Sequence, residues 1–209
     1  FHRSHLSLVF NLLRVIPKKN FTPDIYTVKE ISRVIKSGHG VCIFPEGMSS
    51  ISGANQPVAL GTGKLFKHHK VPVYYSVIRG GYLTSPKYNL RDRVGHVEVE
   101  YDQLFTVEDL ERMTPAEIES KINHAIYHDD YAWNKIHKHH YDIGENGAED
   151  LEDLLFWCPR CGRQHTMATK GNTIFCTECG NGATLLDTYE LVPFDDSCAR
   201  TSSRSGENA

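Results

Sequence analysis

Apolar residues recur every three or four positions in four segments of the chain, and this spacing predicts four helices. The first covers residues 6–16. The second begins at Thr22-Pro23-Asp24, which has the form of an N-cap followed by proline at the first helical position, and it ends at a pair of glycines. The third covers residues 58–69. The fourth begins at the capping box Thr114-Pro115-Ala116-Glu117.

Three apolar segments outside these helices predict strands. Residues 41–44 form a short continuous apolar run between glycines and Pro45, which is typical of a strand buried on both faces. Residues 71–78 are rich in β-branched and aromatic side chains. Across residues 97–101, valine and tyrosine alternate with glutamate, which predicts a strand with one wet face. Helices interleaved with apolar strands indicate an α/β layer architecture.

The chain has 209 residues, enough for one ordinary domain and a small module. We expect a first domain over residues 1–143, an acidic connector over 144–155 and a cysteine module over 156–194. Residues 195–209 lack apolar anchors and predict a disordered tail. Because the chain opens on Phe1 within an amphipathic stretch, we expect the natural protein to begin further upstream.

Composition and charge narrow the classes of protein. Hydrophobic residues make up 40% and charged residues 23%, values typical of a folded soluble protein. A net charge of -3 argues against a nucleic-acid binder that acts through a broadly basic surface. No run reaches the roughly 18 apolar residues that a membrane-spanning helix needs. We therefore expect a soluble or peripheral protein.

Four of the six cysteines stand in two Cys-x-x-Cys pairs, Cys158 with Cys161 and Cys176 with Cys179. The spacing lets both thiolates of a pair reach one Zn²⁺ at about 2.3 Å, and the glycine after each pair permits a tight turn. Four thiolates leave no position for a reacting water, so the pattern predicts a structural zinc ribbon. Two disulfides or a redox pair are the alternative, and the duplicated spacing favours metal in a reducing compartment.

Three further expectations concern His165, the segment between the two cysteine pairs, and Cys42. His165 lies beside the cysteines but is expected to be a hairpin residue rather than a ligand, because four sulfurs suffice. The segment between the two pairs has no dense basic stripe, which favours packing or protein contact over nucleic-acid binding. Cys42, within the apolar run, is expected to be a small buried hydrophobe.

The segment Phe44-Pro45-Glu46-Gly47-Met48-Ser49-Ser50 directly follows the expected buried strand. In open α/β sheets, ligands bind at the carboxyl ends of the strands. Gly47 permits close approach of a ligand to backbone N–H groups, and the two serines offer hydroxyl donors to an anion. Taken alone, the segment also fits an ordinary turn.

Phe44-Pro45-Glu46-Gly47 with Ser50 resembles the Phe-Pro-Glu-Gly-Thr-Arg-Ser block that binds the acceptor phosphate in the 1-acyl-glycerol-3-phosphate acyltransferase family. The neighbouring blocks that resemble this family, in its order, are Ile16-Pro17-Lys18-Lys19, Val71-Pro72-Val73 and Gly80-Gly81-Tyr82-Leu83 with Pro86. Asp130-Tyr131-Ala132-Trp133 is similar to a segment that precedes a zinc ribbon in one branch of the family. The resemblance covers nearly the whole chain and implies a mixed or mostly parallel sheet flanked by helices, followed by the ribbon.

Two features depart from the family pattern. Met48-Ser49 stands where the family has Thr-Arg, which removes a guanidinium able to clamp phosphate, and Lys18, Lys19 or Arg79 are the candidates to replace it. The family's catalytic His-x-x-x-x-Asp block lies upstream of the lysine-bearing turn, and no such block precedes the turn in this chain, since His2 is followed five positions later by Ser7. We therefore expect the chain by itself to be inactive.

For the intact protein, the resemblance implies acyl transfer from acyl-coenzyme A or acyl carrier protein to a lysophospholipid hydroxyl, with 1-acyl-glycerol-3-phosphate as the expected acceptor. The upstream histidine would be the general base, oriented by the aspartate. The residues implied to hold the glycerol phosphate are Glu46, Gly47, Ser49, Ser50, Lys18 and Lys19. No catalytic metal is required. The substrate class implies peripheral contact with the cytoplasmic face of a membrane.

Other polar clusters leave alternatives open. His124 and His128 are four residues apart, and further histidines follow at His137, His139 and His140 beside Asp129 and Asp130. Without a regular ligand frame, a solvated polar face is favoured over a second metal site. The basic residues between Lys64 and Lys70 fit either a membrane-facing patch or a solvated helix face.

Two other classes of function remain besides the enzyme. The chain is alternatively a zinc-ribbon interaction module on an inactive acyltransferase-like scaffold, in which case the upstream catalytic block is replaced. A nucleic-acid binder is disfavoured by the net charge.

Overall fold

The computed structural model describes residues 10, 12, 14–17 and 24–198. They belong to two compact units. Unit 1 comprises Phe1–Met48, Val58–Val73 and Phe105–Ile122, and unit 2 comprises Ser49–Pro57, Tyr74–Leu104 and Asn123–Ala209. The helix expected over residues 6–16, the cap at Thr22-Pro23, and the tail beyond residue 198 lie wholly or mostly outside the described residues.

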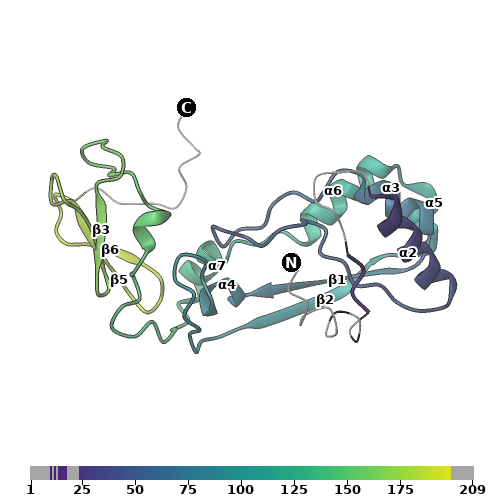
Figure 1. The fold of residues 1–209 in the computed structure, drawn as a ribbon, viewed down its shortest axis with the longest axis horizontal. Helices are drawn as coiled ribbons and strands as arrows, with labels where there is room; N and C mark the ends of the chain where they lie inside the picture. Colours follow the sequence, from purple (N-terminus) through teal and green to yellow (C-terminus); the bar gives the residue numbers. More distant parts are fainter. Residues whose placement is uncertain (1–9, 11, 13, 18–23, 199–209) are drawn as a thin grey trace. The chain divides into compact units, whose positions relative to one another are not determined.

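The elements of the described chain are helices up to residue 153, apart from two strands, and its last four elements are strands (Figure 1). The helices are α2 (Ile25–Lys36), α3 (Thr62–His69), α4 (Gly81–Thr84), α5 (Val107–Arg112), α6 (Pro115–Ala125), α7 (Asp130–His137) and the 3-10 helix η1 (Leu151–Asp153). The strands are β1 (Val73–Arg79), β2 (Glu98–Phe105), β3 (Met167–Lys170), β4 (Thr173–Cys176), β5 (Gly182–Leu185) and β6 (Leu191–Pro193). Among the helices described, none is both long enough and apolar enough to cross a membrane.

Three predicted helices are confirmed: α2, expected after Thr22-Pro23-Asp24, α3, expected over residues 58–69, and α6, expected after Thr114. Helix α2 is capped by Asp24, whose Oδ1 accepts a hydrogen bond from the Thr27 N–H at 3.1 Å. The capping box predicted before α6 is present, since the Thr114 N–H donates to Glu117 Oε2 at 2.7 Å and the Glu117 N–H donates to Thr114 Oγ1 at 3.3 Å.

Helix α3 packs very closely on α6. A Cβ added at Gly63 would come within 2.1 Å of the Pro115 carbonyl oxygen, so only glycine fits this contact. From α6, Glu119 Oε1 accepts hydrogen bonds from the N–H groups of Gly61 at 3.0 Å and Gly63 at 3.1 Å, where α3 begins. A carboxylate at this position satisfies otherwise unpaired donors and complements the positive end of the helix dipole.

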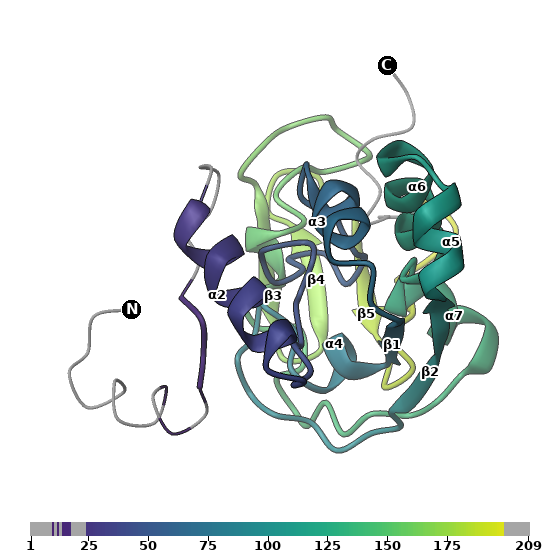
Figure 2. The same ribbon diagram turned by 90° about the vertical axis from the view of Figure 1, so that its right-hand side faces the viewer.

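The basic cluster between Lys64 and Lys70 holds α5 in place. Lys67 Nζ donates to the carbonyl oxygens of Leu110, Glu111 and Met113 at 3.1, 3.2 and 2.7 Å, at the carboxyl end of α5. Figure 2 shows α5 beside α6. Lys67 is therefore a helix cap, and the membrane-facing interpretation of the other basic residues of this cluster stays a prediction.

Strands β1 and β2 pair in a two-stranded sheet, mostly within unit 2. Both strands were predicted, but the expectation that β2 has one wet face is wrong. Val99 and Tyr101 are 59% and 79% exposed, and only Leu104 and Phe105 at the end of the strand are buried. Among the described residues, no helix or strand covers the face of β2 that carries Val99 and Tyr101. The alternation of apolar residues with glutamate along this strand is therefore not accompanied by burial of the apolar face.

The carboxyl-terminal part of unit 2 is an antiparallel sheet of four strands in the order β3-β4-β5-β6. Met167 pairs with Cys176 and Leu185 with Leu191 in this register. Its buried side chains continue into a core that includes residues from far upstream: Leu83, Tyr88, Tyr141, Ala148, Leu151, Cys158, Met167, Ile174, Cys176, Leu185 and Tyr189. Ala148 and Leu151 come from the acidic connector expected over 144–155, which therefore contributes to this core.

A buried arginine fastens residues 83–93 to the sheet. Arg93 is 6% exposed, and its guanidinium donates to the hydroxyl groups of Tyr88 and Tyr189 and to the Gly147 carbonyl oxygen. The Tyr189 hydroxyl in turn donates to the Leu83 carbonyl oxygen at 2.5 Å. These hydrogen bonds from the Arg93 guanidinium to three acceptors offset the cost of burying its positive charge.

Two expectations about the apolar run at residues 41–44 are wrong. The run is not a strand, Phe44 is 85% exposed, and Cys42 is exposed rather than buried. A strand needs the backbone hydrogen bonds of a neighbour, and no described segment pairs with this run. The mixed or mostly parallel sheet is likewise not confirmed. The described chain is α/β, and its larger sheet is antiparallel.

Replacing Arg93 by methionine will lower the free energy of unfolding by about 3 kcal/mol, because three buried acceptors lose a charged donor. Chemical denaturation followed by circular dichroism measures the change. Arg91→Met is the matched control, since Arg91 forms an exposed pair with Glu149 at 2.9 Å, and its loss will cost no more than about 0.5 kcal/mol. Equal effects of the two substitutions would contradict the role of Arg93.

Candidate functional site

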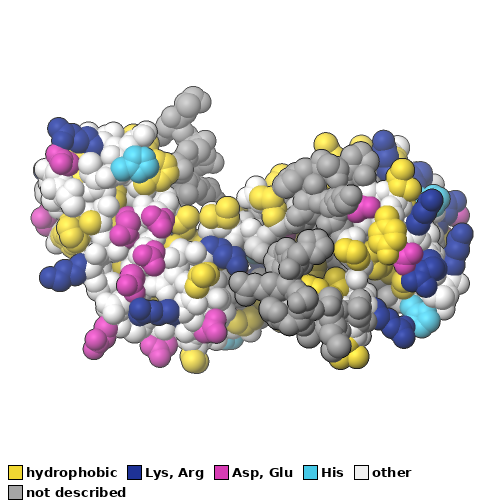
Figure 3. All heavy atoms as spheres, in the orientation of Figure 1, with side chains coloured by type: hydrophobic (Ala, Val, Ile, Leu, Met, Phe, Trp, Pro, Cys, Tyr) yellow, Lys and Arg dark blue, Asp and Glu magenta, His cyan; other side chains and the backbone are white. Residues whose placement is uncertain are grey.

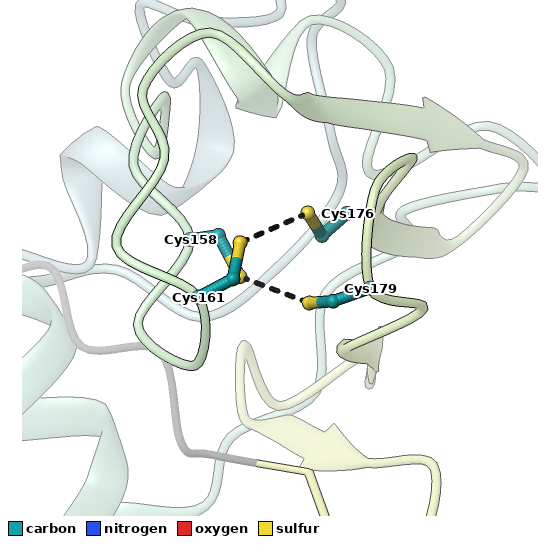
Figure 4. Close-up of side chains that lie close together, drawn as sticks. All are labelled: Cys158, Cys161, Cys176 and Cys179. Carbon is teal, nitrogen blue, oxygen red and sulfur yellow. Dashed lines mark hydrogen bonds between the residues drawn. The ribbon is translucent and has the colours of Figure 1, made fainter.

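The four paired cysteines converge on one point (Figure 4). All four sulfurs lie within 4.8 Å of one another, with Cys158 Sγ 3.6 Å from Cys179 Sγ and Cys161 Sγ 3.8 Å from Cys176 Sγ. These separations are too long for disulfides, and the four cysteines are free thiols. Sulfurs at the corners of a tetrahedron around zinc lie about 3.8 Å apart, given a Zn–S distance of about 2.3 Å.

Each cysteine pair sits on a tight turn closed by the glycine that follows it. The Gly162 N–H donates to the Cys158 carbonyl oxygen at 2.9 Å, and the Gly180 N–H donates to the Cys176 carbonyl oxygen at 3.0 Å. Both glycines have φ of +70°, a left-handed conformation that favours glycine. The two turns are therefore equivalent, as their sequences predicted, and they direct both sulfurs of each pair inward.

The surroundings of the sulfurs favour a bound cation. Burial raises the pKa of the Cys158 thiol to about 12. Burial also opposes ionisation of Cys176, but hydrogen bonds from Thr166 and from the N–H groups of Cys179 and Glu178 lower the pKa of that thiol to about 6. Without a cation, the four groups cannot all be thiolates at neutral pH. The donor set fits a closed, structural Zn²⁺ site and leaves no place for a reacting water.

The residue beside this four-cysteine site is not a further ligand. His165 has φ of +56°, and its ring stacks on Phe156 with centroids 5.3 Å apart. It does not belong to the group of side chains close enough to share an ion with the cysteines. This position agrees with the prediction that His165 is a hairpin residue rather than a ligand.

The Pro-Glu-Gly segment in unit 1 forms a β-turn. The Gly47 N–H donates to the Phe44 carbonyl oxygen at 3.1 Å, and Gly47 has φ of +75°. The Pro45 carbonyl oxygen accepts from the Ala59 N–H at 2.8 Å, which ties the turn to the segment before α3. Glu46 is half-buried, and a Cβ added at Gly47 would meet nothing within 4 Å. Open space therefore adjoins the backbone of the turn.

The other predicted substrate-binding residues are placed as follows. Ser49 is exposed, and Ser50 is half-buried in unit 2, where its Oγ donates to the Ala54 carbonyl oxygen at 2.7 Å. Lys18 and Lys19 lie outside the described residues. Arg79, a candidate replacement for the family's arginine, pairs with Glu100 at 3.3 Å. The assignment of these residues to phosphate binding stays a prediction.

Two segments that carry the family resemblance meet inside unit 2 with the residues that follow Ser50. Asp130 Oδ2 accepts from the Tyr82 N–H at 2.8 Å, and the rings of Tyr82 and Tyr131 meet edge to face with centroids 5.8 Å apart. The Tyr82 hydroxyl donates to the Ile51 carbonyl oxygen at 2.5 Å. A Cβ at Gly53 would meet the rings of both tyrosines at 3.0 to 3.1 Å. The chain that follows Ser50 is thus held against the Gly80–Leu83 and Asp130–Trp133 blocks.

Asp130 is a buried acid at the centre of this arrangement. It is 1% exposed, and within the described chain its Oδ1 has no hydrogen-bond partner. Burial raises the pKa of Asp130, and the N–H groups of Gly80 and Tyr82, which donate to the carboxyl group, lower it only in part. A proton on this group removes the cost of the buried charge.

The histidines noted in the sequence do not form one cluster. His139 lies instead beside His96 and Glu98, and their ligand atoms fall within 4.8 Å of one another. His124 and His128 are not part of this group. Sequence reasoning missed His96 and Glu98, although alternate residues of an extended segment share a face and His96-x-Glu98 is such a pair.

The chain is similar to a protein named 1-acyl-sn-glycerol-3-phosphate acyltransferase from Cocos nucifera. The two are 30% identical over 112 residues, which is 53% of this chain and 34% of that protein. This chain thus spans about a third of the length of that relative. No family model matches the sequence, and no solved structure matches it. The similarity supports the expected relationship to lipid acyltransferases at the level of the enzyme class.

A Cys161→Ser, Cys176→Ser double variant will lose one equivalent of zinc per chain, as measured by plasma mass spectrometry on dialysed protein. One cysteine is removed from each turn, so neither pair remains intact. Cys42→Ser is the matched control, because Cys42 is exposed and distant in sequence, and its zinc content will equal that of the parent. Unchanged zinc in the double variant would show that these sulfurs are not the ligands.

The raised pKa of Asp130 predicts a pH-dependent contribution to stability. An acid whose folded pKa exceeds its unfolded value, about 3.9, stabilises the fold at low pH. This contribution is lost as pH rises towards the folded pKa. The unfolding free energy of the parent minus that of Asp130→Asn will therefore fall as pH rises from 4 to 7, measured by urea denaturation. A difference that is constant or rises with pH would contradict the assignment.

Proposed function

We propose that this chain is part of an enzyme that transfers an acyl group from acyl-coenzyme A or acyl carrier protein to the hydroxyl of a lysophospholipid, with 1-acyl-glycerol-3-phosphate as the first candidate. The similarity to the coconut protein carries this proposal. In this account the catalytic His-x-x-x-x-Asp block stands upstream of Phe1. Residues 1–209 supply positioning of the acceptor rather than the general base.

The geometry of the turn at Phe44–Gly47 supports this role. A positive φ at Gly47 and the open space over its Cα leave the backbone accessible to a ligand. Glu46 belongs to the same turn, and the Ala59 N–H, which donates to the Pro45 carbonyl oxygen at 2.8 Å, ties this turn to the segment before α3. A turn tied by such a backbone bond suits a binding loop, because less conformational entropy remains to be lost on binding.

The reaction would proceed by attack of the acceptor hydroxyl oxygen on the thioester carbonyl carbon. The upstream histidine takes the hydroxyl proton, the carbon–sulfur bond breaks, and the proton passes to the leaving thiolate. An ester and a free thiol result. Glu46, Gly47, Ser49, Ser50, Lys18 and Lys19 are the residues proposed to hold the glycerol phosphate.

Peripheral membrane contact is part of the same proposal. Large apolar side chains of unit 1 are exposed, including Ile25 at 69%, Phe44 at 85% and Leu60 at 97%. Figure 3 shows hydrophobic and basic side chains side by side over the part of the surface that carries α2 and α3. An apolar and basic surface of this kind suits the cytoplasmic face of an anionic bilayer.

A zinc-ribbon interaction module on an inactive scaffold is the second candidate. The replacement of the family's Thr-Arg by Met48-Ser49 favours it, because Met48 is 49% exposed and carries no charge for a phosphate. On this account the upstream histidine block is degenerate, and a partner protein binds an exposed part of the ribbon.

Glu46→Ala in the full-length protein will lower kcat/KM for acyl transfer from acyl-coenzyme A to lysophosphatidic acid by about 100-fold, because the acceptor is misplaced. Release of free thiol measures the rate. Glu30→Ala is the matched control, a glutamate of the same unit whose partner is Arg33 at 2.7 Å, and its rate will be unchanged.

The same assay separates the two candidates. A folded, zinc-containing full-length protein that shows no turnover would reject the enzyme and favour the interaction module. Equal rates for Glu46→Ala and Glu30→Ala would reject the binding role of the turn.

A further inference from the structure

His96, Glu98 and His139 bring three metal-binding groups together within unit 2. His96 and Glu98 lie where β2 begins, and His139 follows α7. Their ligand atoms are within 4.8 Å of one another, and His96 Nε2 lies 3.0 Å from Glu98 Oε1. None of these residues takes part in the four-cysteine site or in the proposed phosphate loop.

The backbone, not only the side chains, holds the two segments together. Gly95 and Tyr141 form an antiparallel bridge, and the Asp142 N–H donates to the Val94 carbonyl oxygen at 2.8 Å. The Tyr141 hydroxyl donates to the His96 carbonyl oxygen at 2.8 Å. The Cα positions of His96 and His139 are therefore fixed relative to each other independently of any ion.

A buried asparagine fixes His139. Asn134 is fully buried, its Oδ1 accepts from the His139 N–H at 2.9 Å, and its Nδ2 donates to the His139 carbonyl oxygen at 3.0 Å. The Nε2 atom of His139 is itself buried and, among the described residues, has no hydrogen-bond partner. A buried nitrogen without a partner is costly, and His139 belongs with His96 and Glu98 to one group of possible metal ligands.

We propose that His96, Glu98 and His139 bind a second divalent transition-metal ion. Two imidazoles and a carboxylate are the donors that Zn²⁺ and Ni²⁺ accept, whereas Mg²⁺ and Ca²⁺ prefer oxygen alone. The side chains of His96 and Glu98 are 45% and 48% exposed, so water can complete the coordination. The site is open on one side and binds its ion less tightly than four thiolates do.

Binding requires a local rearrangement of the rings. The imidazoles of His96 and His139 are stacked, with centroids 4.0 Å apart and planes 22° apart, so one ring must turn about its Cβ–Cγ bond to face a shared ion. Trp133 lies beside both rings. Its ring centroid is 6.2 Å from that of His96 and 5.1 Å from that of His139. The ion would cross-link the start of β2 to the segment after α7, which is a role independent of acyl transfer.

Trp133 provides a local reporter, since the chain has only two tryptophans. In a Trp157→Phe background with the four-cysteine site filled with zinc, added Ni²⁺ will quench the fluorescence of Trp133 with saturation at one equivalent. His96→Ala and Glu98→Gln will each weaken this Ni²⁺ binding by at least tenfold. His140→Ala is the matched control: His140 is next to His139 but pairs with Asp187 at 2.8 Å, and its substitution will leave the quenching unchanged.

Zinc content gives an independent readout. After equilibration with Zn²⁺, the parent protein will hold one more equivalent than the His96→Ala, His139→Ala double variant, while the absorbance of a Co²⁺-substituted sample in the thiolate charge-transfer region will be the same for both. Two results would overturn the proposal: equal zinc content in the parent and the double variant, or a loss of quenching in His140→Ala as large as that in His96→Ala. Either result would leave His96 and Glu98 as an exposed hydrogen-bonded pair beside stacked rings.

Discussion

Four sulfur atoms within 4.8 Å of one another are the constraint on which unit 2 depends. As thiolates they repel one another, and Cys158 and Cys176 lie in the apolar core, so a cation bound by the four sulfurs would make their convergence favourable. Cys158 and Cys176 are themselves core residues and contact the same buried cluster as Leu83, Tyr88 and Tyr141. The cysteine module is therefore built into unit 2 rather than attached to it, and Arg93 fastens the two parts with charge-assisted hydrogen bonds.

This arrangement relates the ribbon to the blocks that resemble acyltransferases. The segment Gly80–Leu83 is hydrogen-bonded to both parts. The Tyr82 N–H donates to Asp130 Oδ2, and the Leu83 carbonyl oxygen accepts from the Tyr189 hydroxyl. The chain after Ser50 packs against the same segment through Gly53 and Tyr82. Because the ribbon shares its core with these segments, a cation bound by the four cysteines would stabilise the segments as well as the ribbon.

Features that depend on neighbouring residues, such as helix caps and turns, were predicted correctly from the sequence. Contacts between distant segments of the chain were not. Capping residues and turn glycines act within four residues, so α6 and the two cysteine turns were predictable. The apolar run at residues 41–44 predicts a buried strand, and this prediction is wrong. A strand is buried only when neighbouring segments pair with it and cover it, and the sequence pattern of the run does not reveal those neighbours. The same reason explains why Lys67 was not recognised as the cap of α5, and why His96 and His139, brought together by the bridge between Gly95 and Tyr141, were not paired.

Backbone hydrogen exchange, compared between zinc-loaded protein and protein stripped of metal, tests the central claim most directly. If the four-cysteine site supports the whole of unit 2, removal of zinc will speed exchange in β3–β6 and equally at Tyr82, Arg93 and Tyr141, whose N–H groups donate to Asp130, Thr84 and Asp187. Faster exchange confined to residues 156–194 would contradict the account, because the ribbon would then unfold alone.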